Sequence, residues 1–336
     1  MPKCKLPECP IASGGRCLEG RTDDCPNLLP ESSDAVPAPV PAVKEKSGKK
    51  DEETLALFSG LPLEIADARE FAARGRAIVV ALTGMTESGK TSLLARLHQQ
   101  FQAGTVGGYA FAGSRTLPRF EELNWLATIE SGVGAPRMEH TSRKYDNSFL
   151  HFTVLQSHEG ALPIDVLLND ISGETYPEAI TAESICRQLI CLSRADHLAV
   201  VVDGAAIANR SLRHDHCSKA KNFVERVLQT GQINKATILH LIITKLDVLS
   251  DPAKAEENTA AAARLEEDFT KNFRTKVAGV HTWRIAARPR DGTMPTEESI
   301  AKLFATWVGS TRRYDSNPTV LPLSSSRGRD FNEFGT

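Results

Sequence analysis

The sequence lacks long apolar runs, has almost no net charge and contains few aromatic residues. No apolar run approaches the roughly 18 residues of a membrane-spanning helix, so no membrane span is expected. The first residues lack the basic-then-apolar order of a signal peptide, which predicts a cytoplasmic location. A net charge of −2 gives no overall attraction to nucleic acid or to anionic membranes. Nucleic acid is therefore not an expected partner, and the absence of aromatic side chains from residues 1–30 agrees with this.

Cysteine is scarce except at the start of the chain, where four of the seven cysteines lie within the first 25 residues. A cytoplasmic location argues against structural disulfides there. A segment this short, and rich in Pro and Gly, buries too little surface to fold without a stabilising cross-link. Four thiolates around a tetrahedral Zn²⁺ would supply one. The spacing lacks paired C-x2-C knuckles, so reducible free thiols and a disulfide framework remain alternatives, and an iron–sulfur cluster fits less well. The predicted Zn²⁺ ligands are Cys4, Cys9, Cys17 and Cys25.

Composition divides the chain into four parts. Residues 1–30 form the Cys-rich module, and residues 31–52, rich in Pro, Ala, Ser and Lys, are predicted to be a flexible linker. Residues 53–310 have the apolar periodicity of one large globular domain that begins with a helix. Residues 311–336 are rich in Ser, Arg, Pro and Gly and are predicted to be disordered.

Residues 84–91 read GMTESGKT and match the phosphate-binding pattern G-x-x-x-x-G-K-[ST] at each fixed position. A predicted strand, 77–82, precedes them and a predicted helix, 92–102, follows. In such a loop, backbone N–H groups and the helix dipole surround phosphates, the lysine reaches the outer phosphates, and the threonine hydroxyl binds Mg²⁺. The predicted nucleotide-binding residues are Gly84, Glu87, Ser88, Gly89, Lys90, Thr91 and Ser92, with Lys90 also catalytic and Thr91 also a Mg²⁺ ligand.

Predicted strands alternate with predicted helices through the rest of the large domain. Between the helix 92–102 and about residue 147 the pattern shows a short helix, 118–126, and no clear strand. This alternation predicts an α/β fold with three layers, in which helices cover both faces of a mostly parallel sheet. The later predicted strands are 149–155, 164–168, 197–202, 237–243 and 282–286, and the later predicted helices are 182–191, 219–230, 253–276 and 296–308.

Two further motifs follow predicted strands, at the sheet edge where ligands bind in such folds. Asp170 and Gly173 form a D-x-x-G motif, in which the carboxylate can hold Mg²⁺ and the glycine N–H can approach the terminal phosphate. Residues 244–247, Thr-Lys-Leu-Asp, match [NT]-K-x-D. The carboxylate of Asp247 can accept the two N–H groups of a guanine edge, a donor pair that adenine lacks. Lys245 belongs to the same motif, and Ala287 stands where a further backbone contact to the base is expected.

The order of these motifs resembles the Ras-like, TRAFAC-class P-loop GTPases across residues 76–309. Residues 15–20, 111–122 and 170–174 are more narrowly similar to bacterial double-GTPase (type 2) proteins. That group is linked with multi-gene conflict or anti-phage systems, in which a GTPase controls an effector. The resemblance implies GTP and GDP as ligands, Mg²⁺ as cofactor, and a protein partner that is an effector or a second GTPase of the same system.

Two departures from the Ras-like pattern bear on catalysis. Glu174 stands where relatives often have a water-positioning Gln, and its charge near a triphosphate is unfavourable unless Mg²⁺ or a basic group offsets it. Thr86 and Glu87 occupy loop positions that many relatives fill with glycine, which restricts how an arginine finger could enter. We therefore predict slow or partner-dependent hydrolysis, with Lys90, Gly173 and Glu174 as the catalytic residues.

The threonine that completes the Mg²⁺ site is Thr141 or Thr116, with Thr141 favoured by its distance before the second strand. Arg115, Arg137 and Arg143 are nearby candidates for an arginine finger supplied by the chain itself. The sequence thus favours a Mg²⁺-dependent GTPase switch. Two alternatives remain: a GTP-binding scaffold with little turnover, and a GTP-regulated adaptor that works through the Cys-rich module.

Overall fold

The computed structural model describes residues 59–125, 142–158, 160–288 and 297–309, with a few isolated positions before residue 59. The chain divides into two compact units, residues 1–56 and 57–336. In the first unit β1 (Lys3–Cys4) pairs antiparallel with β2 (Leu28–Leu29). The side chains of the four predicted zinc ligands, the linker 31–52 and the tail 311–336 lie outside the described residues. The zinc site and these boundaries stay predictions.

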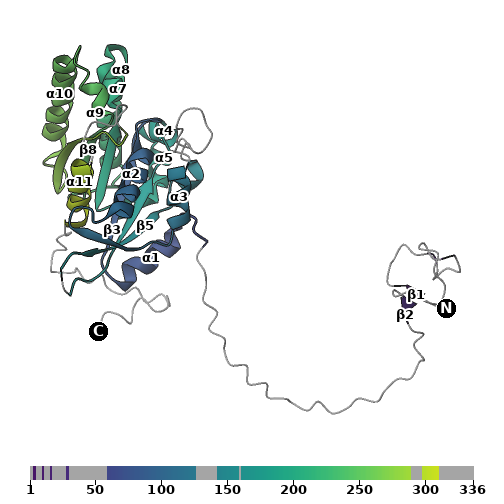
Figure 1. Ribbon diagram of the computed structural model, residues 1–336. Coiled ribbons are helices and arrows are strands. Elements are labelled where there is room, and N and C mark those ends of the chain that lie inside the picture. Colours follow the sequence, from purple (N-terminus) through teal and green to yellow (C-terminus); the bar gives the residue numbers. More distant parts are fainter. Residues whose placement is uncertain are drawn as a thin grey trace, which may run out of the picture. The chain divides into compact units, whose positions relative to one another are not determined.

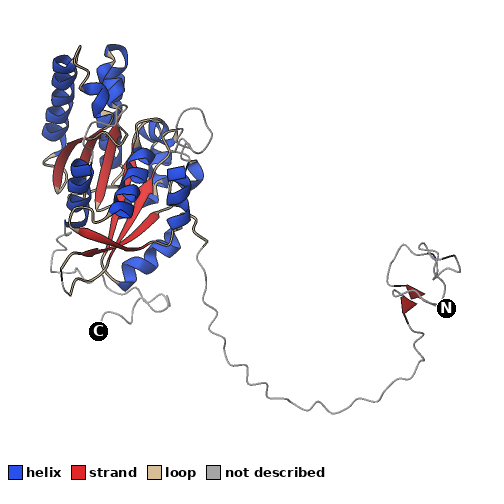
Figure 2. Ribbon diagram, viewed as in Figure 1, coloured by secondary structure: helices blue, strands red, loops and turns tan. Residues whose placement is uncertain are grey.

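The second unit is built on a seven-stranded sheet in the order β4-β5-β6-β3-β7-β8-β9 (Figures 1 and 2). Neighbouring strands from β6 to β9 are parallel, whereas β5 pairs antiparallel with both β4 and β6. The mostly parallel α/β sheet predicted from the sequence is confirmed. The strands are β3 (Ala77–Thr83), β4 (Tyr109–Gly113), β5 (Leu150–Gln156), β6 (Ile164–Asp170), β7 (His197–Val202), β8 (Ile238–Ile243) and β9 (Gly279–Arg284).

Helices cover both faces of this sheet (Figure 1), and the side chains on each face form a separate buried core. One core packs α2, α3 and α11 against the sheet, and the other packs α1 and α4 to α10. Alternate residues of β3 enter the two cores, since Val80 and Leu82 join the first and Ala81 the second. The helices are α1 (Ile65–Arg74), α2 (Lys90–Ala103), α3 (Leu117–Trp125), the 3₁₀ helix η3 (Arg143–Tyr145), α4 (Thr175–Thr181), α5 (Glu183–Gln188), α6 (Ile190–Arg194), α7 (Gly204–Ala208), α8 (Arg210–Gln229), α9 (Leu246–Leu249), α10 (Ala255–Phe273) and α11 (Glu297–Gly309).

Several element predictions were wrong in detail. The sequence pattern missed β4, a five-residue edge strand with only one buried residue, so its alternation of apolar and polar residues is weak. The predicted helix 182–191 is two short helices, α5 and α6, preceded by α4. The predicted helix 219–230 begins earlier, as α8, because the side chain of Asn209 caps its first turn by accepting from Ser211 N–H.

The parallel strands bring the three motifs to one edge of the sheet. The phosphate loop follows β3, Asp170 ends β6, and residues 244–247 follow β8. Because β3 lies between β6 and β7, and β7 pairs with β8, the carboxyl ends of these strands are neighbours. Among the described residues, none of the helices combines the length and apolarity that crossing a bilayer requires.

Candidate nucleotide-binding site

The phosphate loop joins β3 to α2 in a conformation that needs its two glycines. Gly84 has φ 152°, and a methyl group there would lie 2.2 Å from the Val201 carbonyl oxygen of β7. Gly89, with φ 91°, is the last residue before α2. Glu87 is exposed and also has a positive φ of 62°, a conformation that costs a non-glycine residue about 1 kcal/mol or more. The glycines that relatives carry in this loop would adopt such a conformation without that cost.

Lys90 is a buried cation at the start of α2, only 5% exposed. Its Nζ donates hydrogen bonds to the carbonyl oxygens of Gly84 (3.0 Å) and Met85 (3.1 Å). Burial lowers the pKa of Lys90, and the charges of Asp170 and Asp146 oppose that shift. The loop thus holds one positive charge against its own backbone, where it can reach a bound phosphate.

Thr91 and Asp170 meet as the motifs predict. The Thr91 hydroxyl donates to Asp170 Oδ2 at 2.8 Å, which joins the first turn of α2 to the end of β6. A hydroxyl and a carboxylate are oxygen ligands of the kind that Mg²⁺ prefers, so these two residues fit a magnesium site. Ser92 lies half-buried in the same helical turn, and the Ser88 side chain is fully buried beneath the loop.

Gly173 brings the D-x-x-G loop against the phosphate loop. A methyl group on Gly173 would lie 2.4 Å from the backbone nitrogen of Thr86 and 2.5 Å from its Cα. No side chain fits between the two loops, so the Gly173 backbone lies directly against the phosphate loop.

Glu174, the next residue, points to a different partner. Its carboxylate accepts a hydrogen bond from Arg143 Nε at 3.2 Å, and Arg143 also binds Glu178 of α4 at 2.7 and 3.0 Å. Arg143 is thus the basic group that offsets the Glu174 charge in this structure. About half of the Arg143 side chain is exposed, so each ion pair contributes little to stability.

The motif after β8 contacts the phosphate loop directly. The Thr244 hydroxyl lies 2.6 Å from the Ser88 carbonyl oxygen and 3.2 Å from that of Val202. Lys245 adopts the left-handed conformation with φ 51°, and its Nζ forms an ion pair of 2.8 Å with Asp203 Oδ2. Asp203 belongs to none of the sequence motifs, although its place directly after β7, at the same sheet edge, was a usable signal.

Asp247 and Ala287 lie on neighbouring segments at this end of the site. Asp247 is half-buried in the first turn of α9. Ala287 is 8% exposed and follows β9. A backbone hydrogen bond of 3.3 Å from Leu246 N to Ile285 O joins the two segments.

The two threonine candidates for the Mg²⁺ site differ in what is described. Thr141 lies outside the described residues, as does Arg137. The Thr116 hydroxyl accepts a hydrogen bond from the backbone of His151 on β5 at 2.9 Å, and its side chain is fully buried. Arg115 lies over the ring of Phe71, with its guanidinium carbon 4.6 Å from the ring centre.

Arg119 is a cation close to Thr91 and Asp170 that belongs to none of the sequence motifs. It lies on α3 and lines a small cavity together with Thr91, Asp170 and Tyr145. Its guanidinium lies 5.6 Å from the centre of the Tyr145 ring and binds Glu122 at 2.6 Å. Its position two residues after the start of α3 places it in the same small cavity as Thr91 and Asp170, a relationship that only the packing of α3 creates.

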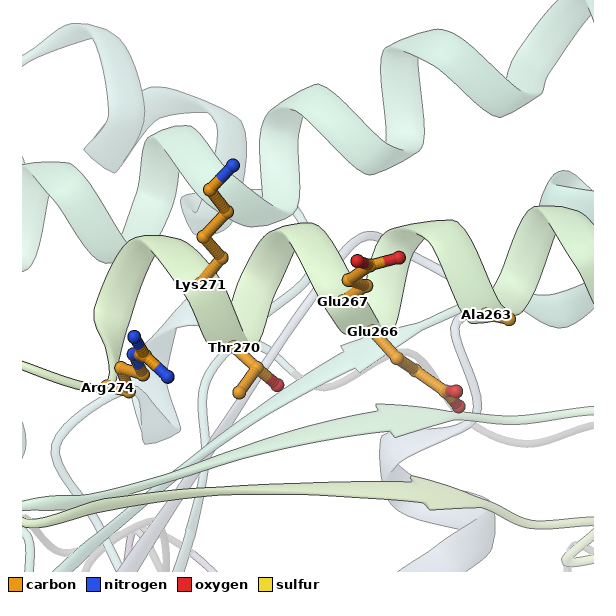
Figure 3. Close-up of a pocket in the computed structure, with 6 residues that line it drawn as sticks. All are labelled: Ala263, Glu266, Glu267, Thr270, Lys271 and Arg274. Carbon is orange, nitrogen blue, oxygen red and sulfur yellow. The ribbon is translucent and has the colours of Figure 1, made fainter.

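A separate, open hollow runs along the surface of α10 (Figure 3). All of its lining side chains belong to α10 or to Arg274, which follows it. Glu266, one of them, is already paired with Arg284 of β9 at 2.7 Å. None of the predicted site residues lines this hollow, so it is not part of the candidate site.

Comparisons with known proteins identify the family of the chain. The family model of the Double-GTPase 2 domain matches residues 78–308, well over half of the chain. No curated protein in the comparison matched the sequence. The matched region contains the phosphate loop, the D-x-x-G motif and residues 244–247. The chain therefore belongs to the Double-GTPase 2 family, and this membership implies that it binds GTP.

Proposed function

We propose that this chain is a Mg²⁺-dependent guanine-nucleotide switch that binds GTP and GDP and hydrolyses GTP slowly. The observation that carries the proposal is the 2.8 Å hydrogen bond between Thr91 and Asp170. It pairs the two residues that would hold Mg²⁺, at the edge of the sheet where the other motifs converge. When bound, Mg²⁺ would neutralise charge on the outer phosphates.

The chain's own residues would divide the work in the following way. The loop N–H groups and Lys90 bind the phosphates, and the Gly173 N–H faces the terminal phosphate. Glu174 orients the attacking water. Asp247 accepts the N–H groups of the guanine edge, while Lys245 and Ala287 border the base. Loss of the terminal phosphate would release the Gly173 region, which is how such switches report hydrolysis.

Titration calorimetry with Mg²⁺ and GTP, GDP or ATP tests this proposal. We expect binding of GTP and GDP and no measurable binding of ATP. Asp247→Asn should shift the preference from guanine towards xanthine nucleotides, because the amide can donate to the xanthine 2-oxygen. The matched control is Asp251→Asn, an exposed aspartate beyond α9, which should leave the preference unchanged. Comparable binding of ATP and GTP by the unmodified chain would overturn the guanine assignment.

The second candidate function is a GTP-binding scaffold that barely turns over. The contact between Arg143 and Glu174 favours this scaffold function. Arg143 pairs Glu174, the residue expected to orient water, and also binds Glu178 of α4. Single-turnover assays, with and without candidate partners, separate the two functions. Measurable phosphate release by the isolated chain would exclude the scaffold.

The proposed function also includes a protein partner and a role for the Cys-rich module. The family resemblance points to a protein partner in the cytoplasm, either an effector or a second GTPase of a bacterial conflict or anti-phage system. The module of residues 1–30 would bind structural Zn²⁺ and act as an adaptor for that partner. Elemental analysis of protein purified without chelator tests the metal. Zinc well below one ion per chain would count against it, and partner binding by a chain that begins at Asp51 would exclude the adaptor role.

A further inference from the structure

Asp146 is a buried carboxylate next to the site that none of the motifs contains. It follows η3 and is 8% exposed. Its Oδ1 accepts a hydrogen bond from the Ser172 backbone N–H at 2.7 Å, and its Oδ2 accepts one from the Thr175 hydroxyl at 2.5 Å. These two donors flank Gly173 and Glu174 in the chain. The Asp146 carboxylate thus accepts hydrogen bonds from residues on both sides of Gly173.

The backbone around Asp146 is tied to the same loop. The side-chain amide of Asn169, just before the D-x-x-G motif, donates to the carbonyl oxygens of Asp146 (2.9 Å) and Ser148 (2.7 Å). The Cys191 thiol also donates to the Asp146 carbonyl at 3.4 Å. Residues 146–148 are therefore bound to the residue that precedes the motif as well as to residues within and beyond it.

Burial makes the Asp146 contacts stronger than the exposed ion pairs nearby. Hydrogen bonds to an ionised carboxylate are about twice as strong as neutral ones, whereas exposed ion pairs such as those of Arg143 contribute little. Burial raises the pKa of Asp146, and the hydrogen bonds from Thr175 and Ser172 and the charge of Arg143 oppose that shift.

The position of Gly173 depends on these bonds. Gly173 lies against Thr86 with no room for a side chain, so its N–H direction is set by the residues that anchor the loop on either side. Ser172 is one anchor and Thr175 the other, and both are held by Asp146. A change at Asp146 would therefore alter what the Gly173 N–H can contact.

We propose that Asp146 is a positioning residue that links residues 142–148 to the D-x-x-G loop and aims the Gly173 N–H at the terminal phosphate of GTP. The inference rests on the proposed guanine-nucleotide function. Its specific consequence is that Asp146 matters for GTP and not for GDP, because GDP has no terminal phosphate to contact Gly173. A residue with a merely structural role would affect both nucleotides alike.

The test measures the affinities of a fluorescent non-hydrolysable GTP analogue and of fluorescent GDP for the full chain with Mg²⁺. For Asp146→Ala we expect analogue binding to weaken about tenfold, with GDP binding unchanged within about twofold. In Asp146→Asn the amide oxygen can accept from Ser172 N–H and the amide nitrogen can donate to the Thr175 oxygen. This variant should therefore retain most of the preference for the analogue over GDP. Thr175→Val should act in the same direction as Asp146→Ala, with a smaller effect.

The control is Asp215→Ala, an exposed aspartate on α8 paired with Lys219, which should change neither affinity. If Asp146→Ala retains the wild-type ratio of analogue to GDP affinity, or lowers both affinities equally, the inference is wrong. If Asp146→Ala does not fold, the same criterion applies to Thr175→Val. If the unmodified chain binds neither nucleotide, the proposed function itself fails, which is a different result from a variant that keeps the wild-type ratio.

Discussion

Gly173 lies so close to Thr86 that a methyl group on its Cα would stand 2.4 Å from the Thr86 backbone nitrogen. This contact joins the D-x-x-G loop to the phosphate loop through backbone atoms. Neither loop can yield by rotating a side chain, so any change at Gly173 must move one loop away from the other.

Gly173→Ala should therefore impair GTP binding more than GDP binding. We expect the affinity for a non-hydrolysable GTP analogue to fall by about tenfold or more, because the separated loop no longer presents its N–H to the terminal phosphate. Fluorescence titration with both nucleotides measures this. Gly75→Ala is the matched control, because nothing lies within 4 Å of a methyl group there. Equal losses for both nucleotides would contradict the prediction.

Asp203→Ala should weaken GTP and GDP binding to the same extent. The ion pair of 2.8 Å with Asp203 holds Lys245, which borders the base, and the base is common to both nucleotides. Since more than a third of the Lys245 side chain is exposed, we expect a loss of roughly threefold to tenfold. The double variant with Lys245→Ala should lose little more than the single variants, and full additivity of the two losses would show that the ion pair has no role in binding.

Two substitutions at Glu174 should change the rate of GTP hydrolysis in opposite directions. Glu174→Gln keeps the ability to orient water and removes a negative charge, so single-turnover hydrolysis should rise about threefold to tenfold. Glu174→Ala removes the water-orienting group and should lower the rate. Glu178→Gln, which changes the other carboxylate bound to Arg143, serves as control and should have a smaller effect than Glu174→Gln. A lower rate for Glu174→Gln would instead indicate that Glu174 acts as a base.

The free energy of unfolding should fall as the pH falls through about 6.5. Burial and the neighbouring His197 and His281 hold the pKa of His240 well below its usual value, and burial also lowers the pKa values of His98 and His151. These side chains take up protons in the unfolded chain first, so stability is present above the unfolded pKa and is lost below it. Each contributes a slope of at most about 1.4 kcal/mol per pH unit.

Urea unfolding between pH 5 and pH 7.5 measures this slope. In His240→Gln the slope should decrease by up to about 1.4 kcal/mol per pH unit, the contribution of one histidine, because glutamine does not titrate. The glutamine side-chain oxygen can still accept the hydrogen bond from Trp283 Nε1–H that His240 Nδ1 accepts at 3.1 Å. An unchanged slope in this variant would show that His240 does not contribute to the pH dependence.

Much of the fold was predictable because its elements have strong local signals. Strand β7 is buried at all six of its residues, and its bounds were predicted correctly from the apolar run that follows His197. Strand β4 was missed because it is a short edge strand, buried only at Tyr109, and is defined by its pairing with β5. The break between α5 and α6 could likewise not be predicted from the apolar pattern, because the buried apolar residues of both helices belong to the same core.

The sequence by itself determined the nucleotide-binding motifs and their order, because each motif is a short run in which spacing along the backbone creates the geometry. The loop from Gly84 to Thr91 lies within a single strand–turn–helix connection, so its pattern could be recognised without knowing the rest of the fold.

Only the tertiary structure decided which residues support those motifs. Arg143 meets Glu174 across 31 positions, Asp146 meets Ser172 across 26, and Lys245 meets Asp203 across 42. Each pair is formed by polar residues that are ordinary in a loop and have no periodic signal. Lys245 and Asp203 become partners because the parallel strands β7 and β8 end at one edge of the sheet and bring their following loops together. Arg143 and Asp146 precede β5, and because β5 runs antiparallel to β6, its start lies beside the end of β6, where the D-x-x-G loop begins.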